Sequence, residues 1–353
     1  MALAAILTAC ILPPVPFPMP KRSAPLKIDL PETLPRQALF TLCHLGETIT
    51  VIDADTWSIA GHIKHPEIRS TSDLALNDRG ILYLTRDGDL DEYSETLIPI
   101  DLTTRTFLDY IVLGQAPYRI AISRSGIAVV SHIAILPQGR SQVSFVDTHT
   151  NRKVNTQIVD GSATYVTTRD HIGYVLVAAW TPLQENHVLV YDLDDFHVRR
   201  KYPLPSGHIS LSGNFVIGRG KMYYISFNED APGNKFKIVE LHLSSGRTRV
   251  VTELPTAGEL GLLSNGNLIV SSGDYQPDTP LRLINPSNGK VLKELFVARN
   301  TDLIRSVGKD MFAVNAVDDN AIFIVDAARF EVLKQIHAPC KPFVLQMHFA
   351  GPP

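Results

Sequence analysis

Short runs of alternating apolar residues, each ended by a polar residue and a turn, recur along most of the chain. The stretch 142–154, QVSFVDTHTNRKV, shows the pattern: an apolar run ends at Asp147, four polar residues follow, and a second run begins. Alternation with a period of two between turn-forming residues is typical of β-strands joined in a hairpin. Because no long stretch shows helical periodicity, the pattern predicts an all-β protein.

The unit recurs seven times. Its copies begin at Thr50, Ile98, Ser144, Leu189, Val239, Arg282 and Phe323. Each copy contains the third and fourth strands of one blade, and the polar residues at the end of the third strands are Asp53, Asp101, Asp147, Asp192, His242, Asn285 and Asp326. Repeats of about 40 to 50 residues with four strands each indicate the blades of a β-propeller. A short acceptor side chain at a strand end can bind the N–H groups of the following turn. We therefore interpret these residues, His242 included, as structural rather than catalytic.

The remaining strands indicate how the ring closes. Hairpins at 73–86, 119–132, 260–273 and 303–316 supply the first and second strands of their blades. The first copy has a second strand at 38–45 but no inner strand before it, whereas one strand, 342–350, remains after the last copy. The sequence thus predicts a seven-bladed β-propeller over residues 37–350, closed by the C-terminal strand in the first blade.

Two cysteines lie near the same end of this closing strand pair. Cys43 and Cys340 fit no metal-ligand or redox spacing, so a disulfide and two unpaired thiols are the alternatives. We favour unpaired thiols, because a register shift of a few residues would separate them too far for a bond.

The N-terminal residues have the features of an export segment. Residues 1–10 end in LTAC, which resembles a bacterial lipobox with Cys10 as the lipidated residue. Residues 11–36 are rich in proline and predict an extended tether. Together they predict a periplasmic or surface lipoprotein that touches the membrane only through its lipid. Because residues 1–8 contain no Lys or Arg and are short for a signal peptide, either the true start lies upstream or the likeness is accidental.

Two stretches resemble a known repeat family. In 143–161 an aspartate follows the strand and Thr-Asn occupies the turn, while in 114–126 a glycine and a proline precede the inner strand. Both are similar to the YVTN-type β-propeller repeats of bacterial and archaeal surface and periplasmic proteins, and the likeness covers about residues 38–350. It implies a seven-bladed propeller with a binding role, although related propellers include lactonases and subunits of amine dehydrogenases.

Composition narrows the function classes. Lys and Arg total 33 against 36 Asp and Glu, so no basic surface for nucleic acid is expected. No haem-attachment, zinc-protease, nucleophile-elbow or phosphate-loop motif occurs. We therefore predict a non-enzymatic protein of the cell envelope that binds a protein or polysaccharide. The alternative is a lactonase-like hydrolase, which would require at least two of His65, Arg119, His208, Glu259 and Arg305 to meet at the channel mouth.

The binding face is predicted from loop length. The second-to-third loops at 86–95, 135–142, 180–187, 227–235 and 273–280 are long and polar, so the face that carries them is the expected binding side. Candidate ligand-binding residues there and at the channel mouth are His65, Arg86, Tyr118, Arg119, Trp180, His208, Asn228, Tyr275 and Arg305. Arg119 and Arg305 hold equivalent places in two inner strands, which allows an anionic group at the axis or channel water.

One loop has the composition of a metal site. Asp87, Asp89 and Asp91 alternate as the oxygen ligands of a calcium loop do. No glycine at the sixth position and no acid at the twelfth complete that motif, so a solvated acidic loop is the other interpretation. Apart from calcium, no cofactor is expected.

Overall fold

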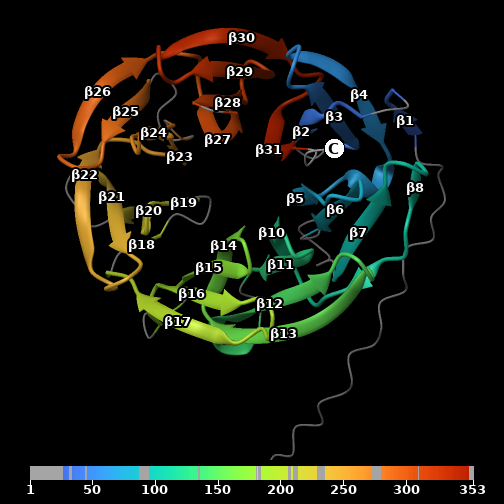
Figure 1. Ribbon diagram of the computed structural model, residues 1–353, viewed down its shortest axis with the longest axis horizontal. Helices are drawn as coiled ribbons and strands as arrows, with labels where there is room; N and C mark the ends of the chain where they lie inside the picture. Colours follow the sequence, from blue (N-terminus) through green and yellow to red (C-terminus); the bar gives the residue numbers. More distant parts are fainter. Residues whose placement is uncertain are drawn as a thin grey trace, which may run out of the picture.

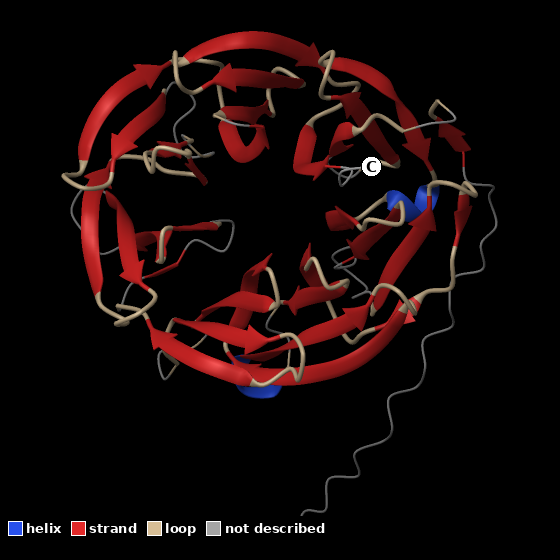
Figure 2. Cartoon of the chain, in the orientation of Figure 1, coloured by secondary structure: helices blue, strands red, loops and turns tan. Residues whose placement is uncertain are grey.

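The computed structural model describes residues 27–31, 34–43, 46–86, 95–133, 136–179, 181, 184–205, 208–209, 214–228, 235–271, 273, 280–308 and 310–349. Over these residues the strands form seven sheets, arranged as blades around a central axis (Figure 1). The predicted all-β seven-bladed propeller is therefore confirmed. The described helices are two short 3-10 turns, η1 (Pro66–Ile68) and η2 (Pro137–Gly139) (Figure 2). None of them has the length and hydropathy needed to cross a lipid bilayer.

Blades 1 to 4 follow the chain with the innermost strand given first, except that the inner strand of blade 1 is C-terminal. Blade 1 contains β31 (Pro342–Phe349), β2 (Gln37–Cys43), β3 (Thr48–Asp53), β4 (Ser58–Lys64) and β1 (Lys27–Asp29). Blade 2 contains β5 (Thr71–Leu76), β6 (Ile81–Arg86), β7 (Thr96–Asp101), β8 (Thr106–Phe107) and β9 (Ile111–Val112). Blade 3 contains β10 (Pro117–Ile122), β11 (Ile127–His132), β12 (Arg140–Asp147) and β13 (Arg152–Asp160). Blade 4 contains β14 (Ser162–Arg169), β15 (Ile172–Ala178), β16 (His187–Asp192) and β17 (Val198–Pro203).

Blades 5 to 7 complete the ring. Blade 5 contains β18 (His208–Ile209) and β19 (Phe215–Gly218), which both pair with β20 (Lys221–Asn228), then β21 (Lys235–His242) and β22 (Thr248–Leu254). Blade 6 contains β23 (Leu260–Leu262), β24 (Leu268–Val270), β25 (Leu281–Asn285) and β26 (Lys290–Leu295). Blade 7 contains β27 (Thr301–Gly308), β28 (Met311–Ala316), β29 (Ala321–Asp326) and β30 (Glu331–His337).

The hydrophobic core lies between blades. Alternate residues of each sheet point to opposite neighbours: Val129 packs with blade 4, whereas Val130 packs with blade 2. Each of the seven junctions has its own buried cluster, including the one between blades 7 and 1 around Leu39 and Leu345. Each blade therefore needs both neighbours to bury its two faces.

The repeated aspartates form the predicted turns. Asp53 Oδ1 accepts hydrogen bonds from the N–H groups of Asp55 (2.8 Å) and Thr56 (3.2 Å), and the equivalent residues of blades 2, 3, 4, 6 and 7 bind their own turns in the same way. In blade 5 the His242 ring instead contacts the Glu240 carboxylate, and backbone bonds close the turn at Gly246.

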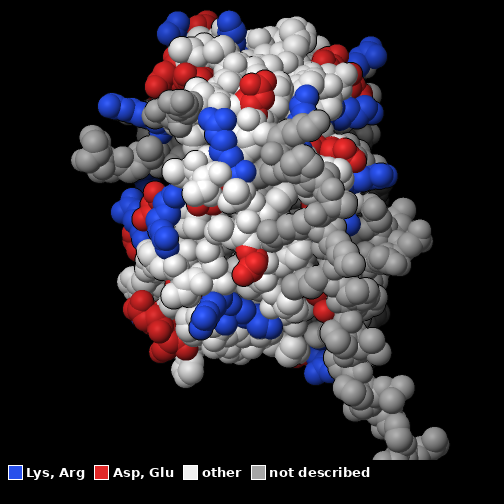
Figure 3. Space-filling model, turned by 90° about the vertical axis from the view of Figure 1, so that its right-hand side faces the viewer, with Lys and Arg blue, Asp and Glu red and all other residues white. Residues whose placement is uncertain are grey.

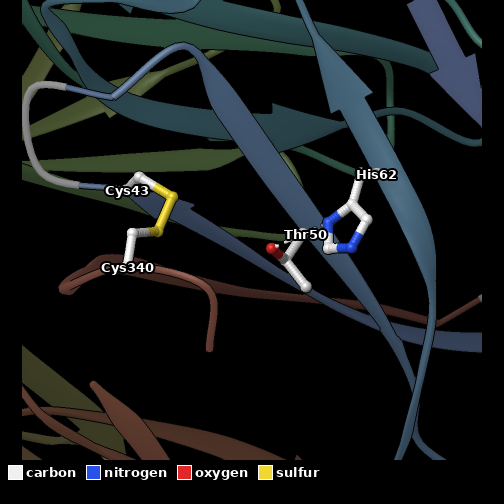
Figure 4. Close-up of a disulfide and its surroundings, with 4 residues drawn as sticks. All are labelled: Cys43, Thr50, His62 and Cys340. Carbon is white, nitrogen blue, oxygen red and sulfur yellow. Dashed lines mark hydrogen bonds between the residues drawn. A yellow bond between two sulfur atoms is a disulfide. The ribbon is translucent and has the colours of Figure 1, made fainter. Parts of the chain in front are cut away.

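The C-terminal strand closes the ring as predicted. β31 pairs antiparallel with β2, and Leu39 lies opposite Met347. The preference for unpaired cysteines was wrong: Cys43 and Cys340 form a disulfide, with their Cα atoms 5.5 Å apart (Figure 4). The register matters here, because Cys43 lies opposite Pro342, two residues from Cys340.

The tether prediction needs a correction at its C-terminal end. Of residues 11–36, only part is described, and Lys27–Asp29 form β1, which pairs with the outer strand β4 instead of extending freely. Gly61 permits this approach, because a Cβ there would lie 1.8 Å from the Asp29 carbonyl oxygen. The Leu30 carbonyl also accepts a hydrogen bond from Arg105 of blade 2. Cys10 and residues 11–26 lie outside the described residues.

Candidate functional site: the central channel and the loop face

Bulges interrupt four of the inner strands, and polar residues lie beside them. The pairing of β5, β10, β14 and β27 with their second strands shifts by one residue near Asp73, Arg119, Tyr165 and Leu303. Side chains of second strands bind the N–H groups displaced in this way: Ser131 Oγ accepts from Arg119 N at 3.1 Å, and Asn315 Oδ1 accepts from Leu303 N at 2.6 Å.

An acid and an arginine from neighbouring blades meet at the axis. Arg305 Nη1 donates to Glu259 Oε2 at 2.5 Å and to the carbonyl oxygen of Ile304 at 2.8 Å. Glu259 is fully buried, and the same Oε2 accepts the Ile304 N–H at 3.0 Å. Its other oxygen, Oε1, has no hydrogen-bond partner among the described residues.

A second pair of charges lies across the channel. Asp73 accepts hydrogen bonds from the N–H groups of Leu74 (2.9 Å) and Ile120 (3.1 Å), and the Arg119 guanidinium lies 4.7 Å from the Tyr118 ring. Burial raises the pKa of the Asp73 carboxyl, and Arg119 together with these N–H groups opposes the rise. The charges of both pairs act on one another and on Tyr165, so two acids and two arginines largely balance around the axis.

The structure brings together some of the predicted residues. Arg119, Tyr118 and Arg305 lie at the channel, but the two arginines do not hold equivalent places. Ile120 faces Val130 and Ile304 faces Val314, so Arg119 precedes the matched position and Arg305 follows it. Sequence reasoning missed Asp73 and Tyr165, and the buried acid within the apolar inner strand TSDLAL was the available signal.

Other predicted residues lie elsewhere. His65 follows the outer strand β4, where its ring packs edge-on against Phe107 of blade 2 and accepts the Glu67 N–H, so its expected place at the channel mouth was wrong. Arg86 ends β6 on the face of the second-to-third loops. Asp87, Asp89, Asp91, Trp180 and Tyr275 lie outside the described residues, as do the side chains of His208 and Asn228. No cluster of metal-binding side chains occurs in the part of the chain that the structure describes.

Strand pairing defines the two faces of the ring. Thr71 at the start of β5 faces Arg86 at the end of β6, so inner strands begin on the face that carries the long loops and end at the short hairpin turns. A cavity of about 400 Å³ lies at the axis between blades 4 to 7 and includes Arg169 and Arg305. Its residues come from the middle and the ends of the inner strands, so it belongs to the hairpin side of the channel.

A groove of about 460 Å³ lies on the loop face between blades 3 and 4. Arg140 and Lys201 contribute cationic groups to it, and Asp160 and Glu185 contribute carboxylates. Gln184 Nε2 crosses between the blades and donates to the carbonyl oxygens of Gln138 (3.1 Å) and Gly139 (3.2 Å).

The outer rim carries charges of both signs as well. Figure 3 shows lysines and arginines interspersed with acids on the side formed by blades 1 and 2. This distribution agrees with the balanced composition, and the described residues visible in this view form no continuous basic surface.

Comparison with known proteins supports the architecture alone. No family model and no curated protein sequence matches the chain. Solved structures do match the chain. The chain is a seven-bladed β-propeller. It is similar to apo AztD from Citrobacter koseri (TM-score 0.56, 14% identity, covering 88% of this chain and 98% of that one). It is also similar to BamB from Moraxella catarrhalis (TM-score 0.53, 17% identity, covering 85% of this chain and 85% of that one). A third similar structure is a chain of a nidogen/laminin complex (TM-score 0.51, 13% identity, covering 89% of this chain and 99% of that one). Identities this low show a shared propeller fold and leave the function to the site.

Proposed function

We propose that the protein is a non-enzymatic binding protein of the cell envelope, and that it binds a protein partner on the loop face. The observation that carries this proposal is the groove between blades 3 and 4, where Arg140 and Lys201 lie near Asp160 and Glu185. Because the blades hold these charges of both signs in fixed positions, they favour a partner whose charges are complementary. A partner that brings like charges together would bind more weakly. The Gln184 side chain helps to hold blades 3 and 4 together at this groove, because its amide donates a hydrogen bond from blade 4 to the Gln138 carbonyl oxygen of blade 3.

Several features support the location. The Cys43–Cys340 disulfide is favoured in oxidising compartments such as the periplasm and the cell surface. The lipobox-like segment with Cys10 and the YVTN-like repeats agree with an exported, lipid-anchored propeller. The chain of the nidogen/laminin complex shows that this fold occurs in a protein–protein complex.

The test is a capture experiment with charge reversal. We compare the unaltered protein with an Arg140→Glu/Lys201→Glu double variant, using envelope extract and chemical cross-linking. A control variant, Arg152→Glu/Lys290→Glu, makes the same charge change at exposed outer-strand positions. We expect the groove variant to lose about tenfold or more of the captured partner, because buried charge pairs at interfaces contribute a few kcal/mol, while the control retains it.

Two results would contradict protein binding at the groove. One is capture that glycosidases abolish and proteases spare, which would assign a polysaccharide ligand. The other is equal loss in both variants, which would show that overall charge and not the groove matters. Recovery of the protein in the cytosolic fraction with its N-terminus intact would reject the envelope location.

A propeller hydrolase is the second candidate, favoured by one observation. Glu259 and Arg305, two residues of the set that the hydrolase hypothesis named, form an ion pair in the channel, but Glu259 is fully buried and does not lie at the channel mouth. Lactone hydrolysis that is lost in a Glu259→Gln variant would support it. Unchanged hydrolysis in that variant, or none in the unaltered protein, would reject it.

A further inference from the structure

The channel cavity has a positively charged lining. Arg169 is exposed at the end of β14, and Arg305 lies deeper on β27 with its side chain 16% exposed. No acidic residue is among the described residues that line the cavity. Glu259 lies behind Arg305 and is fully buried, so its carboxylate holds the guanidinium from the side away from solvent.

Within the described part of the chain, one edge of the Arg305 guanidinium has no hydrogen-bond partner. Its hydrogen bonds to Glu259 Oε2 and to the Ile304 carbonyl both use Nη1. Nε and Nη2 bind no acceptor among the described residues, and the side chain is 16% exposed. Two parallel N–H donors of this kind match the two oxygens of a carboxylate, and the contact with Glu259 fixes their orientation in advance.

The other walls indicate the rest of the ligand. Leu260, Leu262, Ile304 and Phe312 give an apolar side. Tyr165 lies opposite and packs edge-on against Phe215. Burial raises the pKa of the Tyr165 hydroxyl, so this group stays protonated and can donate a hydrogen bond. A volume of about 400 Å³ is within the range of small-molecule sites.

We propose that the channel cavity binds a small carboxylate with a short apolar body, held by the Nε–Nη2 edge of Arg305. Arg169 attracts the anion at the mouth, and the leucines and Phe312 contact the apolar body. A phosphate fits less well, because one guanidinium edge supplies too few donors for a dianion. The site lies on the hairpin side, away from the groove between blades 3 and 4, and does not depend on the proposed protein binding.

The experiment titrates the purified protein with butyrate, benzoate and phenylacetate by calorimetry, with butyramide, benzamide and inorganic phosphate as comparison ligands. We expect at least one carboxylate to bind and its amide and phosphate to bind at least about tenfold more weakly, because charge-assisted bonds contribute about 1.5 to 3 kcal/mol. Arg305→Lys keeps the positive charge but removes the pair of parallel N–H donors formed by Nε and Nη2. This variant should bind the carboxylate about tenfold more weakly.

Three further variants separate binding from folding. Ser306→Tyr places a ring in the cavity from an exposed position and should abolish binding, while Arg169→Gln should weaken it several-fold. Arg329→Gln alters an exposed arginine of blade 7 that does not line the cavity and should change nothing. Circular dichroism verifies the fold; if Arg305→Lys does not fold, Ser306→Tyr and Arg169→Gln decide. The proposal is overturned if no carboxylate binds, if amides bind equally, or if Ser306→Tyr binds as before.

Discussion

At the scale of single residues, His132 shows how a buried polar group is accommodated in a blade. Its Nδ1 lies 2.7 Å from the Gln115 carbonyl oxygen and its Nε2 lies 3.0 Å from Ser144 Oγ. A neutral ring with the proton on Nδ1 satisfies both partners, donating to Gln115 and accepting from Ser144. Burial lowers the pKa of His132 to about 4, and the Gln115 hydrogen bond opposes this only in part.

This arrangement predicts a dependence of stability on pH. Between about pH 6.5 and pH 4 the unfolded chain binds a proton at His132 and the folded protein does not, so the free energy of unfolding falls as the pH is lowered. We expect a loss of about 2 to 3 kcal/mol by pH 4.5 from this group. Urea unfolding at pH 7 and pH 4.5 measures it.

A His132→Gln variant should lose much of that dependence. The exposed His149→Gln variant serves as the control and should retain it. Burial also lowers the pKa of His187, so a smaller dependence of the same sign remains in the His132 variant. Identical pH dependence of the His132→Gln variant and the unaltered protein would contradict the assignment.

At the scale of elements, side chains at or just before three inner strands bind the backbone of the next inner strand. Asp73 accepts the Ile120 N–H, Asn214 binds both the N–H (2.7 Å) and the carbonyl oxygen (2.9 Å) of Leu260, and Glu259 accepts the Ile304 N–H. These three acceptors hold neighbouring blades at their inner edges, where little side-chain volume is available for packing. Sequence periodicity located the strands but not these connections, because the partners are 45 to 47 residues apart.

An Asn214→Leu variant tests this connection. Asn214 is 3% exposed, so the substitution leaves the N–H and carbonyl groups of Leu260 buried without partners. We expect the free energy of unfolding to decrease by about 2 to 4 kcal/mol. Asn265→Ala removes a turn bond at an exposed site of the next blade and should cost less than about 1 kcal/mol. Equal losses in chemical denaturation would show that Asn214 adds nothing beyond a turn contact.

At the scale of the whole molecule, stability depends on the junction where the ring closes. Seven interblade clusters share the core, and the cluster between blades 7 and 1 requires a strand from the C-terminal end of the chain to pair with β2. The disulfide joins residues separated by 297 positions at this junction. A bond across so long a loop restricts the unfolded chain strongly.

A Cys43→Ser/Cys340→Ser variant should therefore be less stable by about 2 to 5 kcal/mol, measured by denaturant unfolding under oxidising conditions. Adding a reductant should bring the unaltered protein to the same midpoint and leave the double variant unchanged. A reductant that changes neither protein would mean that the two thiols are not joined.

The candidate site was less predictable than the fold. Arg119, Arg305 and Glu259 were identified from their positions near inner strands, but their partners depend on bulges that shift side chains by one residue. The sequence pattern could not show that Arg305 meets Glu259 from the preceding blade or that His65 lies on the outer rim. The hairpin-side cavity was missed for the same reason, since four blades contribute to it.

Local patterns alone determined the strands, the aspartate turns and the number of blades, because alternation and turn hydrogen bonds involve residues close in the chain. The sequence also predicted how the ring closes, because the first blade lacked an inner strand and one strand remained after the last repeat. Only the tertiary structure decided the disulfide, the strand β1 on the outer edge and the charge pairs at the axis. These features depend on register and on distances between blades, and a one-residue shift reverses which side chains meet.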